Sequence, residues 1–149
     1  VRRVLALAEG RVQAEGLRQR TLIRSARFSG TLQAERTVMA QDHVVASRTL
    51  KVSGVTSREV VVELHQPAPD GNDYRCTFRI RGLEAGDIRS YAMGVDQMQA
   101  LMLALQGIGV RLYTSDEGKA GQLSYLGHPN LDFPLPDGVQ DLAPPPRRS

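Results

Sequence analysis

The sequence predicts an α+β domain, in which a mainly antiparallel sheet of four to six strands is packed by one central apolar helix. Two patterns carry this prediction. Apolar and polar residues alternate over much of 44–95, and apolar residues then recur every three or four positions over about 97–108. A chain of 149 residues can bury a core without disulfides or metals. We expect residues 42–134 to form this single domain.

The first two strands are predicted from period-two patterning and turn residues. A segment over about 44–52 has one apolar side, which Arg48 interrupts. A β-branched run over 60–64 follows, and Pro67 and Pro69 close it. Both segments are therefore expected to be strands with one face toward a core.

The third predicted strand has the clearest pattern. Its apolar residues alternate with polar residues, of which three are arginines. The apolar positions are Tyr74, Cys76, Phe78 and Ile80, and the polar positions are Arg75, Thr77, Arg79 and Arg81. We expect Cys76 and Phe78 to lie in the core and the arginines to lie on the opposite face. A fourth strand, less regular, is expected over 88–95.

The predicted helix begins after Asp96, a good N-cap, and Gln99 completes a capping box. Helical spacing of apolar residues extends to Ile108, and we expect Leu101 and Leu105 to be buried against the third strand. Gly107 or Gly109 would end the helix near residue 108. Two further short strands, 110–114 and 122–126, would flank a loop over 116–121.

Charge separates an N-terminal segment from the rest. Residues 1–38 hold eight arginines and three glutamates, a net charge of +5, whereas residues 39–149 hold eleven basic and thirteen acidic residues, a net charge of −2. We expect residues 1–38 to be a poorly ordered, dispensable arm and the working protein to begin at Met39, with an upstream initiation codon as the source of the arm. An organellar transit peptide is the alternative. Residues 135–149 are predicted to be a proline-rich disordered tail.

Composition limits the cellular compartment in which the protein is expected and the class of protein to which it can belong. The single cysteine, Cys76, excludes an internal disulfide framework, which favours a reducing cytoplasm. The sequence contains no apolar run of the length that a membrane helix needs. We therefore expect a cytoplasmic protein with no membrane partner.

Several short motifs lie along residues 46–134: Arg48-Thr49-Leu50, Pro69-Asp70, Tyr74-Arg75-Cys76, Phe78-Arg79-Ile80, Gly94-Val95-Asp96, Gln99-Ala100-Leu101, Ala104-Leu105, and Gly127 leading to Phe133-Pro134. Together they resemble a family of small bacterial proteins, the domain of unknown function 6968 family. The most specific piece is the Gly-Val-Asp junction that runs into Gln-Ala-Leu. The resemblance implies a bacterial, cytoplasmic protein and brings no activity with it.

The arginine face is the candidate binding surface. Arg75, Arg79 and Arg81, joined by Arg89 and Lys51 on neighbouring strands, could meet phosphates or an acidic protein. The favoured interpretation is a solvated face whose charges pair across strands with Glu59 and Glu63, because the aromatic residues of this region point inward.

No catalytic, cofactor-binding or metal-binding residue is assigned. His43, His65 and His128 lack metal-ligand spacing, and Cys76 is expected to behave as a small buried hydrophobe. The glycines near the helix, which are Gly94, Gly107 and Gly109, do not form a phosphate-binding loop. The loop over 127–134 is expected to pack against the helix through its apolar anchor, Phe133, with a lid over a ligand pocket as the alternative.

Three functions remain open. The favoured one is a binding or interaction protein, such as an accessory, immunity-like or regulatory partner of another protein, acting through its surface without a cofactor. The second is binding of nucleic acid or an acidic partner through the Arg75, Arg79 and Arg81 face. The third, less favoured, is an enzyme whose site uses carboxylates such as Asp87 or Asp132 near Tyr91 or His128.

Overall fold

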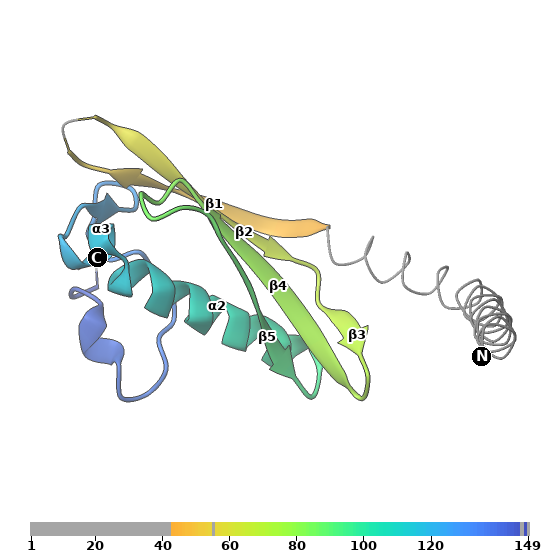
Figure 1. Ribbon diagram of the computed structural model, residues 1–149. Helices are drawn as coiled ribbons and strands as arrows, with labels where there is room; N and C mark the ends of the chain where they lie inside the picture. Colours follow the sequence, from red (N-terminus) through yellow and green to blue (C-terminus); the bar gives the residue numbers. More distant parts are fainter. Residues whose placement is uncertain (1–42, 55, 147, 149) are drawn as a thin grey trace, which may run out of the picture. The chain divides into compact units, whose positions relative to one another are not determined.

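Six strands form one antiparallel sheet, and a long helix lies across one face of it in the computed structural model (Figure 1). The structure describes residues 43–54, 56–146 and 148. The elements are β1 (Val44–Val52), β2 (Arg58–His65), β3 (Ala68–Asp70), β4 (Asp73–Arg81), β5 (Ile88–Gly94), α2 (Gln97–Thr114), α3 (Asp116–Lys119), β6 (Leu123–Ser124) and the 3-10 turn η1 (Gln140–Leu142). The α+β prediction is confirmed, whereas the arm predicted over residues 1–38 lies outside the described residues.

The strand order is β3-β4-β2-β1-β6, with β5 on β4. β5 pairs with β4 over residues 74–80, so β2 and β3 share the other edge of β4. β6 pairs with β1 only at Lys51 and Val52. One sheet edge is therefore β5, and the other is β1 with the short β6 beside its C-terminal end.

β3 differs from the sequence prediction, in which the prolines at 67 and 69 end the extended structure. Pro69 instead lies in β3, opposite Tyr74 of β4. A proline lacks an N–H but keeps its carbonyl, so a short strand of three residues can contain one.

The core lies between the sheet and α2. Phe78, Ile80 and Cys76 of β4 are buried, together with Leu50, Val60 and Val62 of the neighbouring strands. From α2, the buried residues include Ala100, Ala104, Ile108 and Leu112. The two alanines let the helix approach the sheet closely. At Gly94, at the end of β5, an added Cβ would lie 2.3 Å from the Ala100 amide nitrogen.

The helix is longer than predicted and its buried side is different. It continues to Thr114, so the predicted strand over 110–114 was wrong, and the segment 116–121 begins with the short helix α3. Leu101 and Leu105 are only partly buried, whereas Ala100 and Ala104 are fully buried. Helical spacing alone does not distinguish these two neighbouring rows of residues.

Gly107 and Gly109 lie inside α2 and do not end it, and Gly109 is a site of close packing. An added Cβ at Gly109 would lie 2.9 Å from the Pro134 carbonyl oxygen, and one at Gly107 would lie 3.5 Å from the Phe78 ring. The missing side chain at Gly109 thus lets residues 133–135 cross over the helix. The glycine that predicted a helix end is instead a position where another segment approaches the helix closely.

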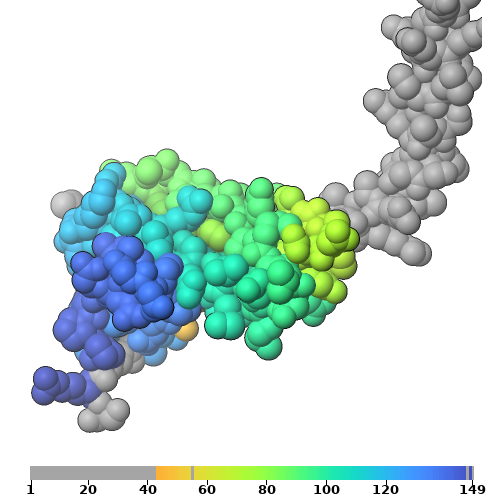
Figure 2. Space-filling view, turned by 90° about the horizontal axis from the view of Figure 1, so that it is seen from below, coloured from red at the N-terminus to blue at the C-terminus, as the bar shows by residue number. Residues whose placement is uncertain are grey.

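The C-terminal stretch, predicted as a disordered tail from residue 135, is described to residue 146 and at 148. Leu135 and Ala143 pack against the core, and the Asn130 side-chain amide donates to the Pro144 carbonyl at 2.6 Å. Figure 2 shows this segment in blue beside the blue-green surface of α2. Within the described ranges, no helix is both long and apolar enough to cross a membrane.

Candidate functional site

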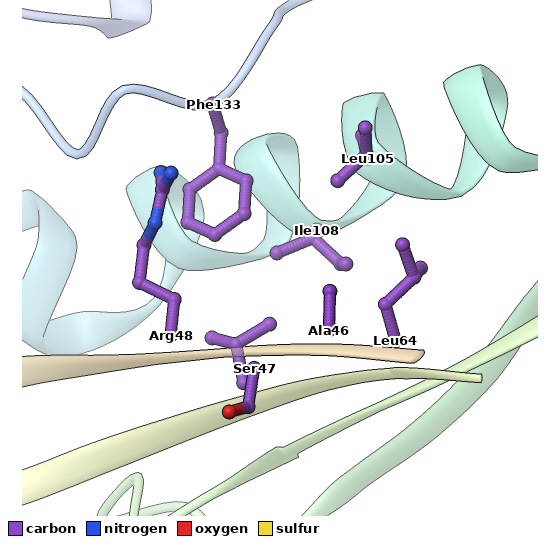
Figure 3. Close-up of a pocket in the computed structure, with 8 residues that line it drawn as sticks. Ala46, Ser47, Arg48, Leu64, Leu105, Ile108 and Phe133 are labelled. Carbon is purple, nitrogen blue, oxygen red and sulfur yellow. The ribbon is translucent and has the colours of Figure 1, made fainter. Parts of the chain in front are cut away.

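A hollow of about 90 Å³ opens between the sheet and α2, beside the N-terminal half of β1 (Figure 3). Its walls come from β1, β2, α2 and the loop that follows β6, and most of its lining is apolar. The lining residues are Ala46, Ser47, Arg48, Val62, Leu64, Leu105, Ile108 and Phe133. At roughly 30 Å³ per water, the hollow has the volume of about three waters, and its apolar walls suit a single aliphatic side chain.

Exposed apolar side chains extend this lining beyond the hollow. On α2, Met98, Met102 and Leu105 follow one another at spacings of four and three, so they share one side of the helix. Met98 is 67% exposed and Met102 is 54% exposed. Val44 and Val45, at the start of β1, are also exposed. An apolar surface of this kind on a small protein is typical of an interaction site.

The edge of β1 next to the hollow is open. β1 pairs with β2 on one side over most of its length, but on the other side β6 covers only Lys51 and Val52. No other described strand pairs with this second edge over residues 44–50. We call residues Val44–Ser47 of this edge the open edge, because their backbone groups there lack a strand partner.

The direction of the free amides follows from the register. The Ser53 amide donates to the Gln122 carbonyl at 2.9 Å, on the β6 side. Because N–H groups of a strand alternate between its two edges, the amides of Lys51, Thr49 and Ser47 point to the same side. The register with β2 is regular from Ala46 onward, with a bulge between Val44 and Ala46. The Ser47 amide therefore points away from the sheet at the open edge.

Arg48 stands at one side of the hollow, opposite Leu105, Leu64 and Ala46 (Figure 3). Its guanidinium carbon lies 4.4 Å from the centroid of the Tyr125 ring and 4.6 Å from that of the Phe133 ring. Its Nη1 donates to the Leu131 and Asp132 carbonyls, each at 2.8 Å. The two rings and two carbonyls fix the cation in place, but they do not neutralise it.

No described carboxylate forms an ion pair with Arg48. The remaining donors, Nε and Nη2, have no hydrogen-bond acceptor among the described residues. A guanidinium has five N–H donors and binds carboxylates well. The sequence contained a signal for this residue, since Arg48 interrupts an otherwise apolar strand face, but it did not say what the arginine contacts.

The predicted binding surface lies on the other face of the sheet, which no described helix covers. Arg75 Nε donates to Asp70 Oδ2 at 2.7 Å, and the Arg75 guanidinium lies 4.1 Å from the Tyr91 ring centroid. Arg81 Nη2 pairs with Glu63 Oε1 at 2.5 Å. Two of the arginines therefore have carboxylate partners within the fold.

The remaining members of this face are Arg79, Arg89 and Lys51. Arg79 is directly opposite Glu63 on β2 and Arg89 on β5, and Lys51 is directly opposite Glu59 on β2. Arg79 has no ion pair with a described carboxylate. The face thus carries five cations against Glu59, Glu63 and Asp70, so its own acidic residues offset much of its charge.

Cys76 is buried on the core side of β4, and its thiol donates to the His65 carbonyl at 3.4 Å. Burial raises the pKa of the thiol to about 11, so almost no thiolate is present at neutral pH. Cys76 is therefore a core residue. Phe78, beside it, is also buried, and Gly107 of α2 packs over its ring.

The capping residues of α2 hold the junction between β5 and the helix. Asp96 Oδ1 accepts from the Gln99 amide at 2.7 Å, and Gln99 Oε1 accepts from the Val95 amide at 2.8 Å. The first bond caps the helix, and the second joins Gln99 to the residue before the cap and not to the cap amide of a capping box. Together the two bonds explain why both residues are polar at a helix start. They assign Asp96 a structural role.

The residues considered for an enzyme site belong to two separate segments, which are β5 with the turn before it and the loop after β6. Asp87 Oδ1 accepts from the Gly82 amide at 3.3 Å, in the turn before β5, and Tyr91 lies under Arg75. His128 pairs through its backbone with Tyr125, and Asp132 follows in the same loop. None of these residues lines the hollow described above or two wider depressions, of about 290 and 410 Å³, near α3 and near Gly54.

Two buried polar groups near α3, Glu117 and Tyr113, were not predicted from the sequence. Glu117 is 2% exposed, and its Oε1 accepts from Arg58 Nη2 at 2.8 Å and from the Glu84 amide at 2.6 Å. Burial alone would raise the pKa of this carboxyl, but the backbone amides of Glu84 and Glu117 and the charge of Arg58 outweigh burial and hold the pKa below its ordinary value. Glu117 is therefore a buried carboxylate whose charge is already satisfied.

Tyr113, at the end of α2, is the second buried polar group near α3. Its hydroxyl oxygen accepts from the amide of Leu131, which is fully buried, at 2.8 Å. Burial raises the pKa of the Tyr113 hydroxyl above its ordinary value, and the nearby Asp132 charge adds to the increase although the Leu131 bond opposes it. We call the region around Tyr113, Glu117 and β6 the closed end.

The geometry defines a two-layer α+β protein with one sheet face that no described helix covers, an open edge and an apolar hollow. The family described as Domain of unknown function (DUF6968) matches residues 46–135, which is more than half of the 149 residues. The chain belongs to this family. No curated protein and no solved structure gave a significant match to the chain.

Proposed function

We propose that this protein is a small bacterial cytoplasmic binding protein that acts through its surface on another protein. The surface that suits this role best is the open edge of β1 together with the hollow beside it. An extended segment of a partner would add to the sheet at Val44–Ser47 and place a side chain in the hollow. Backbone hydrogen bonds would supply affinity, and the hollow would supply selectivity.

One observation carries the proposal: over residues 44–47 the outer edge of β1 has no strand partner among the described residues, and an apolar hollow lies beside Ala46 and Arg48 (Figure 3). Proteins usually protect a sheet edge with charges, bulges or prolines. Here the β1 edge contains a bulge, but it also presents exposed valines at Val44 and Val45. The apolar side of α2, with Met98 and Met102, continues the same surface.

The arginine face supports the alternative, which is binding of nucleic acid or an acidic protein. Its supporting observation is Arg79, which faces Arg89 on β5 and has no ion pair with a described carboxylate. The ion pairs of Arg75 and Arg81 with Asp70 and Glu63 weaken it. A salt-dependent shift of DNA or RNA that disappears when Arg75, Arg79 and Arg81 become alanine would favour this alternative.

The test of the proposed function is selection of displayed random peptides on the full chain and on two matched variants. Ser47→Ala removes the side chain and keeps the backbone amide, whereas Ser47→Pro removes the amide that points away from the sheet. Both should fold, because this amide has no strand partner among the described residues. We expect the same peptides to be enriched on wild type and on Ser47→Ala, and to be lost on Ser47→Pro.

Failure to enrich any sequence would contradict peptide binding. Equal enrichment on Ser47→Pro would contradict strand addition at the open edge. Thermal unfolding of all three proteins, with midpoints within a few degrees of one another, is the control for folding.

A further inference from the structure

This inference rests on the proposed function. The geometry points to the sequence class of the partner, which is an antiparallel segment with an acidic residue two positions before an aliphatic residue. We infer that Arg48 binds the acidic side chain and that the hollow binds the aliphatic side chain. The juxtaposition that carries this inference is a cation without a described carboxylate partner at one side of an apolar hollow, beside the open edge.

The spacing follows from strand geometry. Ala46 and Arg48 point to the same face of β1, toward α2, because side chains of a strand alternate and these two residues both line the hollow. A segment that pairs with this edge places its own inward side chains at alternate positions as well. One inward side chain then lies next to Ala46, and the next one, two residues along, lies next to Arg48.

The two inward positions differ in chemistry. Near Ala46 the walls are Leu64 and Leu105, so a branched aliphatic side chain fits there. Near Arg48, Nε and Nη2 have no acceptor among the described residues, and the Tyr125 and Phe133 rings hold the guanidinium in one position. A fixed guanidinium loses little conformational freedom when it binds a carboxylate, so a charged partner is favoured over a neutral one.

The direction of the segment sets the order of the two residues. Every strand pair in the described sheet is antiparallel, and antiparallel pairing is slightly more stable per residue than parallel pairing. β1 runs from Ala46 to Arg48, so an antiparallel partner meets Arg48 first and the hollow second. The expected order in the partner is therefore acidic residue, any residue, aliphatic residue.

The test uses synthetic peptides with blocked ends and one Glu-Thr-Leu triplet within serine and threonine flanks, measured by fluorescence anisotropy with the full chain. A second peptide replaces the glutamate with glutamine, and a third reverses the triplet to Leu-Thr-Glu. We expect the Glu-Thr-Leu peptide to bind about tenfold more tightly than the glutamine peptide, as for a hydrogen-bonded charge pair. The reversed peptide should bind more weakly than the Glu-Thr-Leu peptide.

The matched variants are Arg48→Gln, which removes the charge and keeps a shorter polar side chain, and Arg48→Lys, which keeps the charge. The preference for glutamate over glutamine should disappear in Arg48→Gln and persist, reduced, in Arg48→Lys. Because the peptide comparison on wild type needs no variant, a folding defect in Arg48→Gln leaves that result intact.

The outcomes separate the two proposals. Equal binding of the glutamate and glutamine peptides, lost in Ser47→Pro, would overturn the role of Arg48 and leave strand addition standing. Tighter binding of the Leu-Thr-Glu peptide than of the Glu-Thr-Leu peptide would overturn the antiparallel order of the two residues. No binding of any of these peptides, together with a failed peptide selection, would overturn both proposals.

Discussion

The two ends of β1 belong to one strand but have opposite surroundings. At Lys51 and Val52, β6 pairs with the strand, and the buried Tyr113 and Glu117 lie at the end of α2 and in α3. At Val44–Ser47, the same edge has no described strand partner, and a hollow lies beside it. The closed end satisfies its buried polar groups within the fold, whereas the open edge leaves backbone groups and a cation without such partners. Stability is therefore expected to depend on the closed end, and binding on the open edge.

The largest effect on stability should come from Gly118 in α3. An added Cβ there would lie 2.0 Å from the Leu112 carbonyl oxygen and 2.9 Å from the Tyr113 Cα, both of which are backbone atoms. Gly118→Ala must displace the helix end and should cost about 3 kcal/mol or more. Gly54→Ala is the matched control, because an added Cβ there meets nothing within 4 Å, and it should stay within about 0.5 kcal/mol of wild type. Chemical denaturation of both variants measures this contrast, and equal costs would contradict it.

A smaller effect is expected from the buried carboxylate. Glu117→Ala leaves the Glu84 amide without its acceptor and should reduce the free energy of unfolding by about 1–3 kcal/mol. Arg58 is partly exposed, so water can compensate for its lost partner and the ion pair adds little. Glu117→Gln is the milder companion variant, since it keeps an oxygen that accepts from the Glu84 amide.

The same residue predicts a pH dependence. The pKa of Glu117 is lower in the folded protein than its ordinary value of 4.5, so its contribution to stability is fully present above pH 4.5 and is lost as the pH falls through the folded pKa. Wild type should therefore exceed Glu117→Gln in stability near neutral pH, and the difference should shrink below pH 4.5. Urea unfolding across this range tests the sign, and a difference that grows on acidification would refute it.

The smallest effects should come from the helix side beside the hollow. Met102→Ser changes a side chain that is 54% exposed, so its cost should stay within about 0.5 kcal/mol. Ile108→Ala, by contrast, removes a fully buried side chain from the same helix and should cost about 2–5 kcal/mol. Relative to the stability that each change costs, Met102→Ser should weaken peptide binding more than Ile108→Ala does, because Met102 is part of the proposed surface. Comparable destabilisation by both changes would place Met102 in the core.

Sequence patterns predicted the sheet, the helix start and the burial of Cys76 and Phe78, because these depend on local periodicity and capping. They did not predict the helix end, because Gly107 and Gly109 serve a contact with Phe78 and with residues 133–135 that are distant in sequence. They also did not predict that Glu117 is buried, since its partners Arg58 and Glu84 come from other parts of the chain. The hollow likewise depends on four separate segments, and two of its residues had a signal in the sequence: Arg48, as an exception in an apolar face, and Phe133, as the apolar anchor of an irregular loop.

The most direct test is amide hydrogen exchange at two residues of the same strand edge. The Ser47 and Ser53 amides both point toward the β6 side of β1, but only the Ser53 amide has a described acceptor, the Gln122 carbonyl. In the free full chain, we expect fast exchange of the Ser47 amide and protection of the Ser53 amide. Addition of a selected peptide should slow exchange at Ser47 and leave Ser53 unchanged. Protection of Ser47 in the free protein, or no change at Ser47 with peptide bound, would contradict an open edge that binds a partner strand.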